Sequence, residues 1–161
     1  MKRLASIVLT LILSSFLPAV STMAEELPAP DGKALWTYMT KTSPYVGWGY
    51  WPGRYGMYEG TEPHGAHLKV FANGPALRAA REGKPMPAGA IVVKENYGMD
   101  GKTLMAVTPM YKMNGYNPEG GDWFWAKYNA DGSIDKEGKV GGCIKCHEAV
   151  KDQNWIFNKA E

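Results

Sequence analysis

The most informative feature of this sequence is a run of five residues close to its C-terminus, Cys143-Ile144-Lys145-Cys146-His147. The run contains both cysteines of the 161-residue sequence. On a helix, two intervening residues place the thiols about one turn apart, and the imidazole follows directly. A disulfide across so short a loop would be strained and would stabilise little. A structural zinc site takes four ligands, which is more than this run supplies. A thioredoxin-like redox pair belongs to a βαβ context, which the sequence does not indicate.

The order of these residues is the pattern of c-type haem attachment. In that chemistry the two thiols add across the vinyl groups of haem to form thioethers, and the histidine becomes a ligand of the iron. The sequence therefore predicts one covalently attached haem c, bound through Cys143 and Cys146, with His147 as the proximal metal ligand.

The first 24 residues have the composition of a secretory signal peptide. Lys2 and Arg3 form a basic start, residues 4–20 are almost entirely apolar or small, and small residues precede a cleavage position after Ala24. The alternative is an uncleaved membrane anchor, although an apolar run of about 17 residues is at the short limit for a span. We expect residues 1–24 to be removed on export to the periplasm, where haem attachment takes place, leaving a domain over residues 25–161.

Charge argues against nucleic acid as a partner. Removing Lys2 and Arg3 from the 18 basic residues leaves 16, equal to the 16 acidic residues of the chain. A near-neutral mature protein without a basic stretch gives no electrostatic basis for nucleic-acid binding. No later segment of the sequence is apolar enough to cross a bilayer, so we expect no membrane span after cleavage.

Turn signals divide the mature chain into short strands and a few helices. Helices are expected from an Asp31 cap to about Thr42, over residues 73–82, and around the cysteines. The aromatic-rich stretch 43–66 is expected to be a long structured loop. The expected strands, with a hairpin turn at Asp100-Gly101, are residues 67–71, 90–97, 102–113 and 123–128. Because short turns join antiparallel strands, the sequence predicts an α+β fold. It is a mainly antiparallel β-sheet with a few flanking helices and C-terminal haem attachment.

The residue pattern leaves the second axial position of the iron open. An electron-transfer cytochrome usually has a second strong ligand, Met or His, whereas a gas-binding or catalytic haem leaves this position free. His64 and His67 are candidates, but their three-residue spacing on a strand would place them on opposite faces, so we do not expect them to bind one metal together. The other candidates are Met39, Met57, Met86, Met99, Met105, Met110 and Met113.

Lys94 lies within the β-branched stretch 90–97. Strand alternation places its side chain on the face of Val92 and Asn96, and on the opposite face from Glu95. From this pattern alone a solvent-facing lysine is the simplest interpretation, because most lysines are exposed.

Several stretches together resemble the cytochrome P-460 family, which includes the beta-type cytochromes c-prime. They are residues 63–71, 89–97, 121–128 and 143–147, and they extend over nearly all of the mature chain. The haem motif by itself is not specific to this family, but its position after a mostly β chain is much more so.

The resemblance implies a usually dimeric protein with a five-coordinate haem. In P-460 members a lysine nitrogen is bonded to the haem ring, and the matching residue is Lys94. The resemblance therefore implies that Lys94 is a catalytic and cofactor-binding residue beside the haem. P-460 members oxidise hydroxylamine, whereas the c-prime members lack the bond, cap the iron with aromatic side chains and bind nitric oxide.

The expected function is therefore a haem oxidoreductase that acts on hydroxylamine or nitric oxide and exchanges electrons with a redox partner protein. The alternative is a non-catalytic protein that binds a gas or carries electrons. Active P-460 enzymes are expected to use a distal carboxylate as proton acceptor, and no residue aligns with that role. Glu95 should point away from Lys94, and Glu119 and Asp122 lie in a turn.

Overall fold

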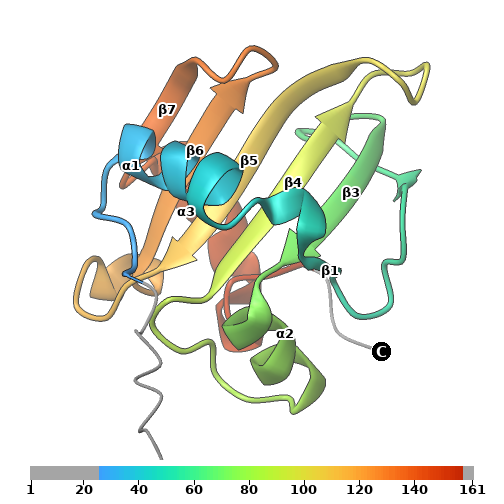
Figure 1. Cartoon of the computed structure of the whole chain (residues 1–161). Coiled ribbons are helices and arrows are strands. Elements are labelled where there is room, and N and C mark those ends of the chain that lie inside the picture. The colour runs from blue at the N-terminus through green and yellow to red at the C-terminus, as the bar shows by residue number, and fades with distance from the viewer. Residues whose placement is uncertain (1–25, 158–161) are drawn as a thin grey trace, which may run out of the picture.

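The structure, a computed structural model, describes residues 26–157. The predicted signal peptide, residues 1–24, lies outside the described part of the chain. A seven-stranded antiparallel sheet runs through the molecule in the order β1-β3-β4-β5-β6-β7, with β2 also paired to β3 (Figure 1). The central strands are consecutive hairpins, so the sheet is a meander. This confirms the predicted α+β class.

The element bounds follow the sequence expectations closely in the centre of the chain. The strands are β1 (Gly49–Tyr50), β2 (Tyr58–Glu59), β3 (His67–Ala72), β4 (Ile91–Tyr97), β5 (Leu104–Lys112), β6 (Trp123–Asn129) and β7 (Ile134–Gly138). The α-helices are α1 (Gly32–Thr37), α2 (Gly74–Arg81) and α3 (Gly141–His147). Short helical turns are η1 (Tyr38–Thr42), η2 (Tyr45–Gly47), η3 (Pro118–Gly120) and η4 (Glu148–Gln153).

Local sequence signals explain where the helices begin. The Asp31 side chain accepts a hydrogen bond from the Ala34 amide at 2.8 Å, which caps α1 as predicted. The π-helical turn η1 then continues this helix to Thr42. Asn73 caps α2 in the same way, and Pro75 occupies its first turn, where no backbone donor is needed.

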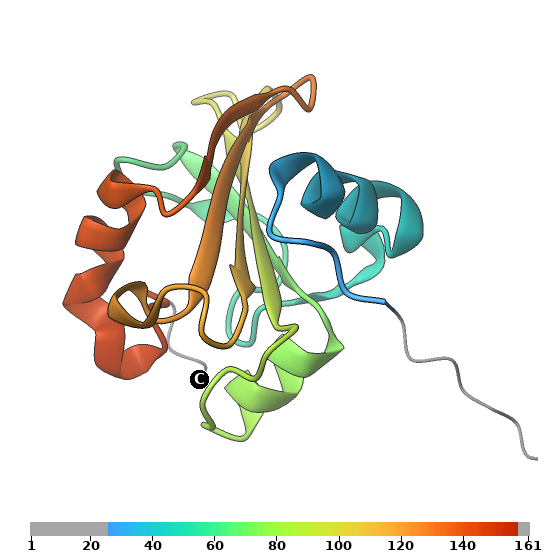
Figure 2. The same ribbon diagram turned by 90° about the vertical axis from the view of Figure 1, so that its left-hand side faces the viewer.

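The two faces of the sheet are covered by different parts of the chain, as Figure 2 shows with the sheet seen edge-on. α1 and η1 pack on one face, where their core includes Leu35 and Met39. α3 and the C-terminal segment cover the other face, and Trp155 and Ile156 belong to its core. α2 lies at one end of the sheet, where its buried alanines join the same core. Successive residues of β4 alternate between these two layers, so the alternation decides which side chains reach the face covered by α3.

Two regions differ from the sequence expectation. The stretch 43–66 contains η2, β1 and β2 rather than loop alone, and one of its aromatic side chains, Tyr55, is 79% exposed. β7 was not expected, because its residues are polar and mostly exposed. It forms the edge of the sheet beside β6, where charged side chains are typical because they discourage pairing with another chain.

Candidate functional site

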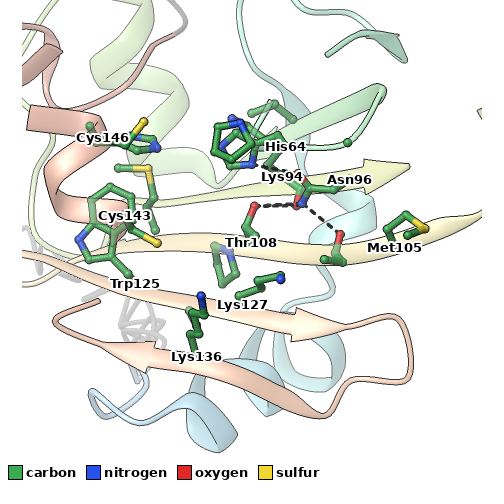
Figure 3. A pocket seen from close by; sticks show the side chains of 18 of the residues that line it. His64, Lys94, Asn96, Met105, Thr108, Trp125, Lys127, Lys136, Cys143 and Cys146 are labelled. Atoms are coloured by element: carbon green, nitrogen blue, oxygen red, sulfur yellow. Dashed lines mark hydrogen bonds between the residues drawn. The ribbon is translucent and has the colours of Figure 1, made fainter. Parts of the chain in front are cut away.

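The sheet face covered by α3 contains a cavity of about 750 Å³. That volume lies within the range of roughly 300–1,000 Å³ that is typical of ligand and cofactor sites. Figure 3 shows both cysteines and Trp125 at one end of the cavity, with Lys94, His64 and Asn96 further along the strands. Much of the lining is apolar and comes from the strands and the C-terminal segment, as in Val70, Val92, Met110, Trp125 and Ile156.

Helix α3 contributes all three residues of the predicted haem motif to this cavity. Cys143, Cys146 and His147 line it together. Both cysteines are free thiols in the structure, Cys143 half-buried and Cys146 exposed. Burial raises the pKa of the Cys143 thiol, and Lys136 and Lys127 oppose that effect. Thiols on one helical turn beside an open cavity are accessible to a group that enters it.

The imidazole of His147 is held in one orientation. Its ring is buried, and the Nδ1–H donates to the Trp155 carbonyl oxygen at 2.7 Å. The rings of Trp125 and Phe157 contact it edge-on, at centroid separations of 4.7 Å and 5.0 Å. Since Nδ1 is occupied by a backbone carbonyl, Nε2 is the nitrogen available to a metal, which is how metal-binding histidines are usually fixed.

The side chain of Lys94 lies in the cavity and is half-buried. The interpretation of Lys94 as a solvent-facing lysine, taken from the strand pattern alone, is therefore wrong. Its strand is central, and its cross-strand neighbours are Val70 on β3 and Thr108 on β5. Burial lowers the pKa of the Lys94 ammonium to about 8, and the nearby Cys146 thiol partly opposes this. Near neutral pH, the neutral, nucleophilic amine is therefore present in a larger fraction of molecules than for an ordinary lysine.

His64 is the residue of this site whose place the sequence did not reveal. It belongs to the loop before β3 rather than to a strand, and it lines the cavity, whereas His67 on β3 does not. Its Nδ1 lies 3.0 Å from the Asn96 side-chain oxygen. Burial lowers the pKa of His64 to about 4, so its ring is neutral near neutral pH. His64 and Asn96 are 32 residues apart in the chain, so sequence spacing alone does not indicate that they meet.

Asn96 and Gly65 explain why His64 lies where it does. The Asn96 side-chain nitrogen donates to the carbonyl oxygens of Lys94 and Ala106 and to the Thr108 hydroxyl, so its oxygen is directed toward His64. A side chain at Gly65 would collide with the backbone of Tyr97 at the end of β4. The absence of a side chain therefore lets the loop approach β4 closely.

The candidate methionines differ in whether they line the cavity. Met99, Met105 and Met110 line the cavity. Met39 is buried in the core on the opposite face of the sheet, and Met86 is buried in the core beside α2. Met57 and Met113 are not among the lining residues. Sequence pattern could not make this division, because methionine fills cores and cavity walls equally well.

The carboxylates are arranged partly as expected. Glu95 is buried on the far face of the sheet, where its two oxygens accept hydrogen bonds from Tyr45 and Tyr97 at 2.8 Å and 2.7 Å. Glu119 and Asp122 lie in and beside the turn η3, away from the cavity lining. Glu62, at the exposed start of the His64 loop, is the carboxylate that lines the cavity.

The residues present fit a haem group. One wall of the cavity contains a buried indole N–H, that of Trp125, with no hydrogen-bond partner among residues 26–157. Such an orphaned donor is rare in a folded protein and is expected where a polar cofactor group belongs. No cluster of three or more His, Cys, Asp or Glu side chains within the same described range could hold a metal ion.

Comparison with known proteins supports this assignment. The sequence matches the family described as Cytochrome P460 over residues 47–158, which includes the elements that form the cavity. No curated protein matches the chain in a direct comparison. No helix among residues 26–157 is long and apolar enough to traverse a bilayer. Since the match extends over most of its length, this chain belongs to the Cytochrome P460 family and is a haem-binding cytochrome of that family.

Proposed function

We propose that this protein is an exported, periplasmic c-type cytochrome whose single haem is attached through Cys143 and Cys146 and ligated by His147. We further propose that it acts on hydroxylamine or nitric oxide in the cavity beside Lys94. The observation that carries the proposal is the convergence of the two thiols, one fixed imidazole and a half-buried lysine on a single cavity of about 750 Å³. A bound haem would supply an iron that changes oxidation state and binds small nitrogen compounds.

The roles of the side chains follow from their positions. The Cys143 and Cys146 thiols would each add S–H across a vinyl group and fix the ring against α3. His147 Nε2 would hold the iron, with its orientation set by the Trp155 carbonyl. Lys94, with its lowered pKa, is partly the neutral amine near neutral pH, which is the form that can bond to the haem ring. After cleavage, residues 25–161 would form the mature haem domain.

Covalent attachment is tested on protein expressed with its own leader and a haem-attachment system. Haem should remain with the polypeptide after acid-acetone extraction and denaturing electrophoresis. Cys146→Ala should leave at most one thioether, visible as a shifted pyridine haemochrome band, and Cys143→Ala should behave alike. Free extraction of haem from the wild type would overturn the attachment. N-terminal sequencing of the same preparation should begin near residue 25, as expected for cleavage.

The activity is tested with the purified cytochrome and an artificial electron acceptor. Hydroxylamine oxidation should reduce the acceptor in proportion to the hydroxylamine consumed, and Lys94→Ala should lose most of this turnover. A specific observation favours the alternative of a gas binder or electron carrier: among residues 26–157, Glu62 is the one carboxylate that lines the cavity, and it is exposed. Nitric oxide binding without any hydroxylamine turnover would support that alternative.

Two partners belong to the same proposal. We expect a homodimer in solution, which sedimentation velocity of the holoprotein will test. We also expect a redox partner protein that accepts or supplies electrons, because the substrate chemistry needs an electron sink. A monomer at all concentrations would leave the haem chemistry unaffected but would overturn the dimer.

A further inference from the structure

The part of the cavity wall formed by β6 and β7 carries two lysines that lie opposite each other on the sheet. Lys127 on β6 and Lys136 on β7 are register partners in the antiparallel pair, and both line the cavity. Figure 3 shows their side chains together on this side of the cavity, with the cysteines at one end of it. Like charges directly opposite each other on neighbouring strands destabilise a sheet, so a negative group beside both amines would best explain the pair.

The described residues neutralise this pair only in part. Lys127 forms an ion pair with Asp135 at 2.9 Å, whereas Lys136 forms no ion pair within residues 26–157. Two lysines and one aspartate leave one net positive charge. With Lys94, three lysines line the cavity against a single carboxylate among the described residues, that of Glu62. The cavity wall therefore attracts a group with negative charge.

Protection of the sheet edge does not account for both lysines. β7 is the edge strand, and the exposed Lys136 on it would discourage pairing with another chain. β6, however, is paired with β5 on one side and β7 on the other, and Lys127 is only partly exposed. A lysine that lines a cavity from an interior strand needs a different explanation from a lysine at an edge.

A carboxylate of the haem is the negative group that this site fits best. Haem carries two propionate carboxylates, on the half of the ring opposite to the vinyl groups that the thiols of α3 would bind. The propionates therefore lie away from the cysteines. A lysine amine forms a strong, charge-assisted hydrogen bond with a carboxylate. One such carboxylate would neutralise the net charge of Lys127, Asp135 and Lys136.

We propose that Lys136, supported by Lys127, binds one propionate carboxylate of the haem and so sets the orientation of the ring in the cavity. The proposal rests on the haem attachment proposed above. It makes Lys136 a positioning residue, because its amine binds a peripheral group of the cofactor and not the iron or the substrate. Attachment to α3 holds one half of the ring, and this ion pair holds the other half.

The test compares the reduction potentials of wild-type holoprotein, Lys136→Gln and Lys136→Arg by spectroelectrochemical titration at pH 7. Removing a positive charge from beside the haem favours the ferric form. At the wild-type midpoint potential, the ferric-to-ferrous ratio should therefore rise roughly 2–5-fold in Lys136→Gln. Lys136→Arg should keep the wild-type ratio, because a guanidinium also binds a carboxylate.

The matched control is Lys139→Gln, three residues along the chain. Lys139 is exposed and does not line the cavity, and its amine lies over the Tyr116 ring at 5.5 Å. This substitution removes the same charge from the chain but should leave the ferric-to-ferrous ratio close to that of the wild type. An unchanged ratio in Lys136→Gln, or an equal rise in Lys139→Gln, would overturn the proposal.

Resonance Raman spectra give a second readout, which a purely structural role of Lys136 would not move. The propionate bending band should shift in Lys136→Gln and keep its position in Lys139→Gln. A band that stays in place in Lys136→Gln would contradict the proposed ion pair.

Added phosphate, at constant ionic strength, distinguishes a haem propionate from a free anion in the same site. The wild-type midpoint potential should not respond to phosphate, because the propionate already occupies the site. A phosphate-dependent potential that is lost in Lys136→Gln would show a solution anion beside Lys136 and overturn the proposal. Haem staining after denaturing electrophoresis reports attachment separately. Free haem in the wild type would overturn the attachment and this proposal with it, whereas stained variants with unchanged potentials would overturn this proposal alone.

Discussion

Lys94 and Glu95 are neighbours in the chain but lie on opposite faces of the sheet. The Lys94 side chain lines the cavity beside α3, whereas the Glu95 carboxylate is buried on the far side between the phenols of Tyr45 and Tyr97. Strand alternation thus separates the Lys94 amine from the nearest carboxylate in sequence. The proton acceptor for any chemistry at Lys94 must come from another element or from water.

Lys94 should be the residue that forms a second covalent link to haem. Forming a bond between its nitrogen and a ring carbon removes one hydrogen from each, and hydrogen peroxide can accept the two electrons and two protons, giving water. Because burial lowers the Lys94 pKa to about 8, the side chain is the neutral amine in roughly a tenth of the molecules at pH 7. Tandem mass spectrometry of peroxide-treated protein should join the Lys94 peptide to the Cys143–Cys146 peptide through haem.

Lys69→Ala is the control for that link. Lys69 is also on the sheet, but its amine donates to the Tyr97 hydroxyl, and it does not line the cavity. The control should keep the cross-linked species, while Lys94→Ala should lose it and show an ordinary c-type spectrum. Identical spectra of wild type and Lys94→Ala, before and after peroxide, would exclude the bond.

Replacing Glu95 should destabilise the fold without removing the haem. Glu95 is 6% exposed and accepts hydrogen bonds from two phenols, which Glu95→Ala would leave unpaired. The expected loss is about 2–3 kcal/mol in the free energy of unfolding, measured by urea denaturation. Glu59→Ala, an exposed position on β2, should change it by less than about 0.5 kcal/mol. A neutral Glu95→Ala would mean that the phenols find other partners.

The buried phenol of Tyr45 predicts how the free energy of unfolding changes with pH in the alkaline range. Burial, and then the hydrogen bond to Glu95, raise the pKa of Tyr45. Above about pH 10 the unfolded chain loses this proton while the folded protein keeps it, so stability should fall as pH rises. In Tyr45→Phe that fall should be shallower, as followed by urea denaturation between pH 9 and about 11. Tyr55→Phe, at a position that is 79% exposed, should retain the wild-type slope.

Particular residues show which parts of the fold and of the site could be predicted from the sequence. The central hairpins were predictable because apolar alternation and turns such as Asp100-Gly101 are local signals. The same alternation correctly separated Lys94 from Glu95. β7 was not predictable, because an exposed edge strand such as Ile134–Gly138 has no apolar face. The place of His64 was not predictable because its partner Asn96 lies 32 residues away, and only the antiparallel pairing of β3 with β4 brings that strand beside the loop.

Gly65 offers a test of the loop before β3 that leaves the haem motif of α3 in place. A Cβ at this position would meet the backbone of Tyr97 rather than a flexible side chain, so Gly65→Ala should push the loop away from β4. His64 would then lose its hydrogen bond to Asn96. Gly65→Ala should therefore lower the free energy of unfolding by about 1–3 kcal/mol, measured by urea denaturation, while haem remains covalently bound.

Gly47→Ala is the matched control for that substitution, because nothing lies within 4 Å of a Cβ at Gly47 and the position is exposed. It should leave the free energy of unfolding close to that of the wild type. Adding Asn96→Ala to Gly65→Ala should cost less than the sum of the two single substitutions, since both remove the hydrogen bond between His64 and Asn96. A Gly65→Ala protein with unchanged stability would show that the loop tolerates the added methyl group, and that the close approach to β4 does not position His64.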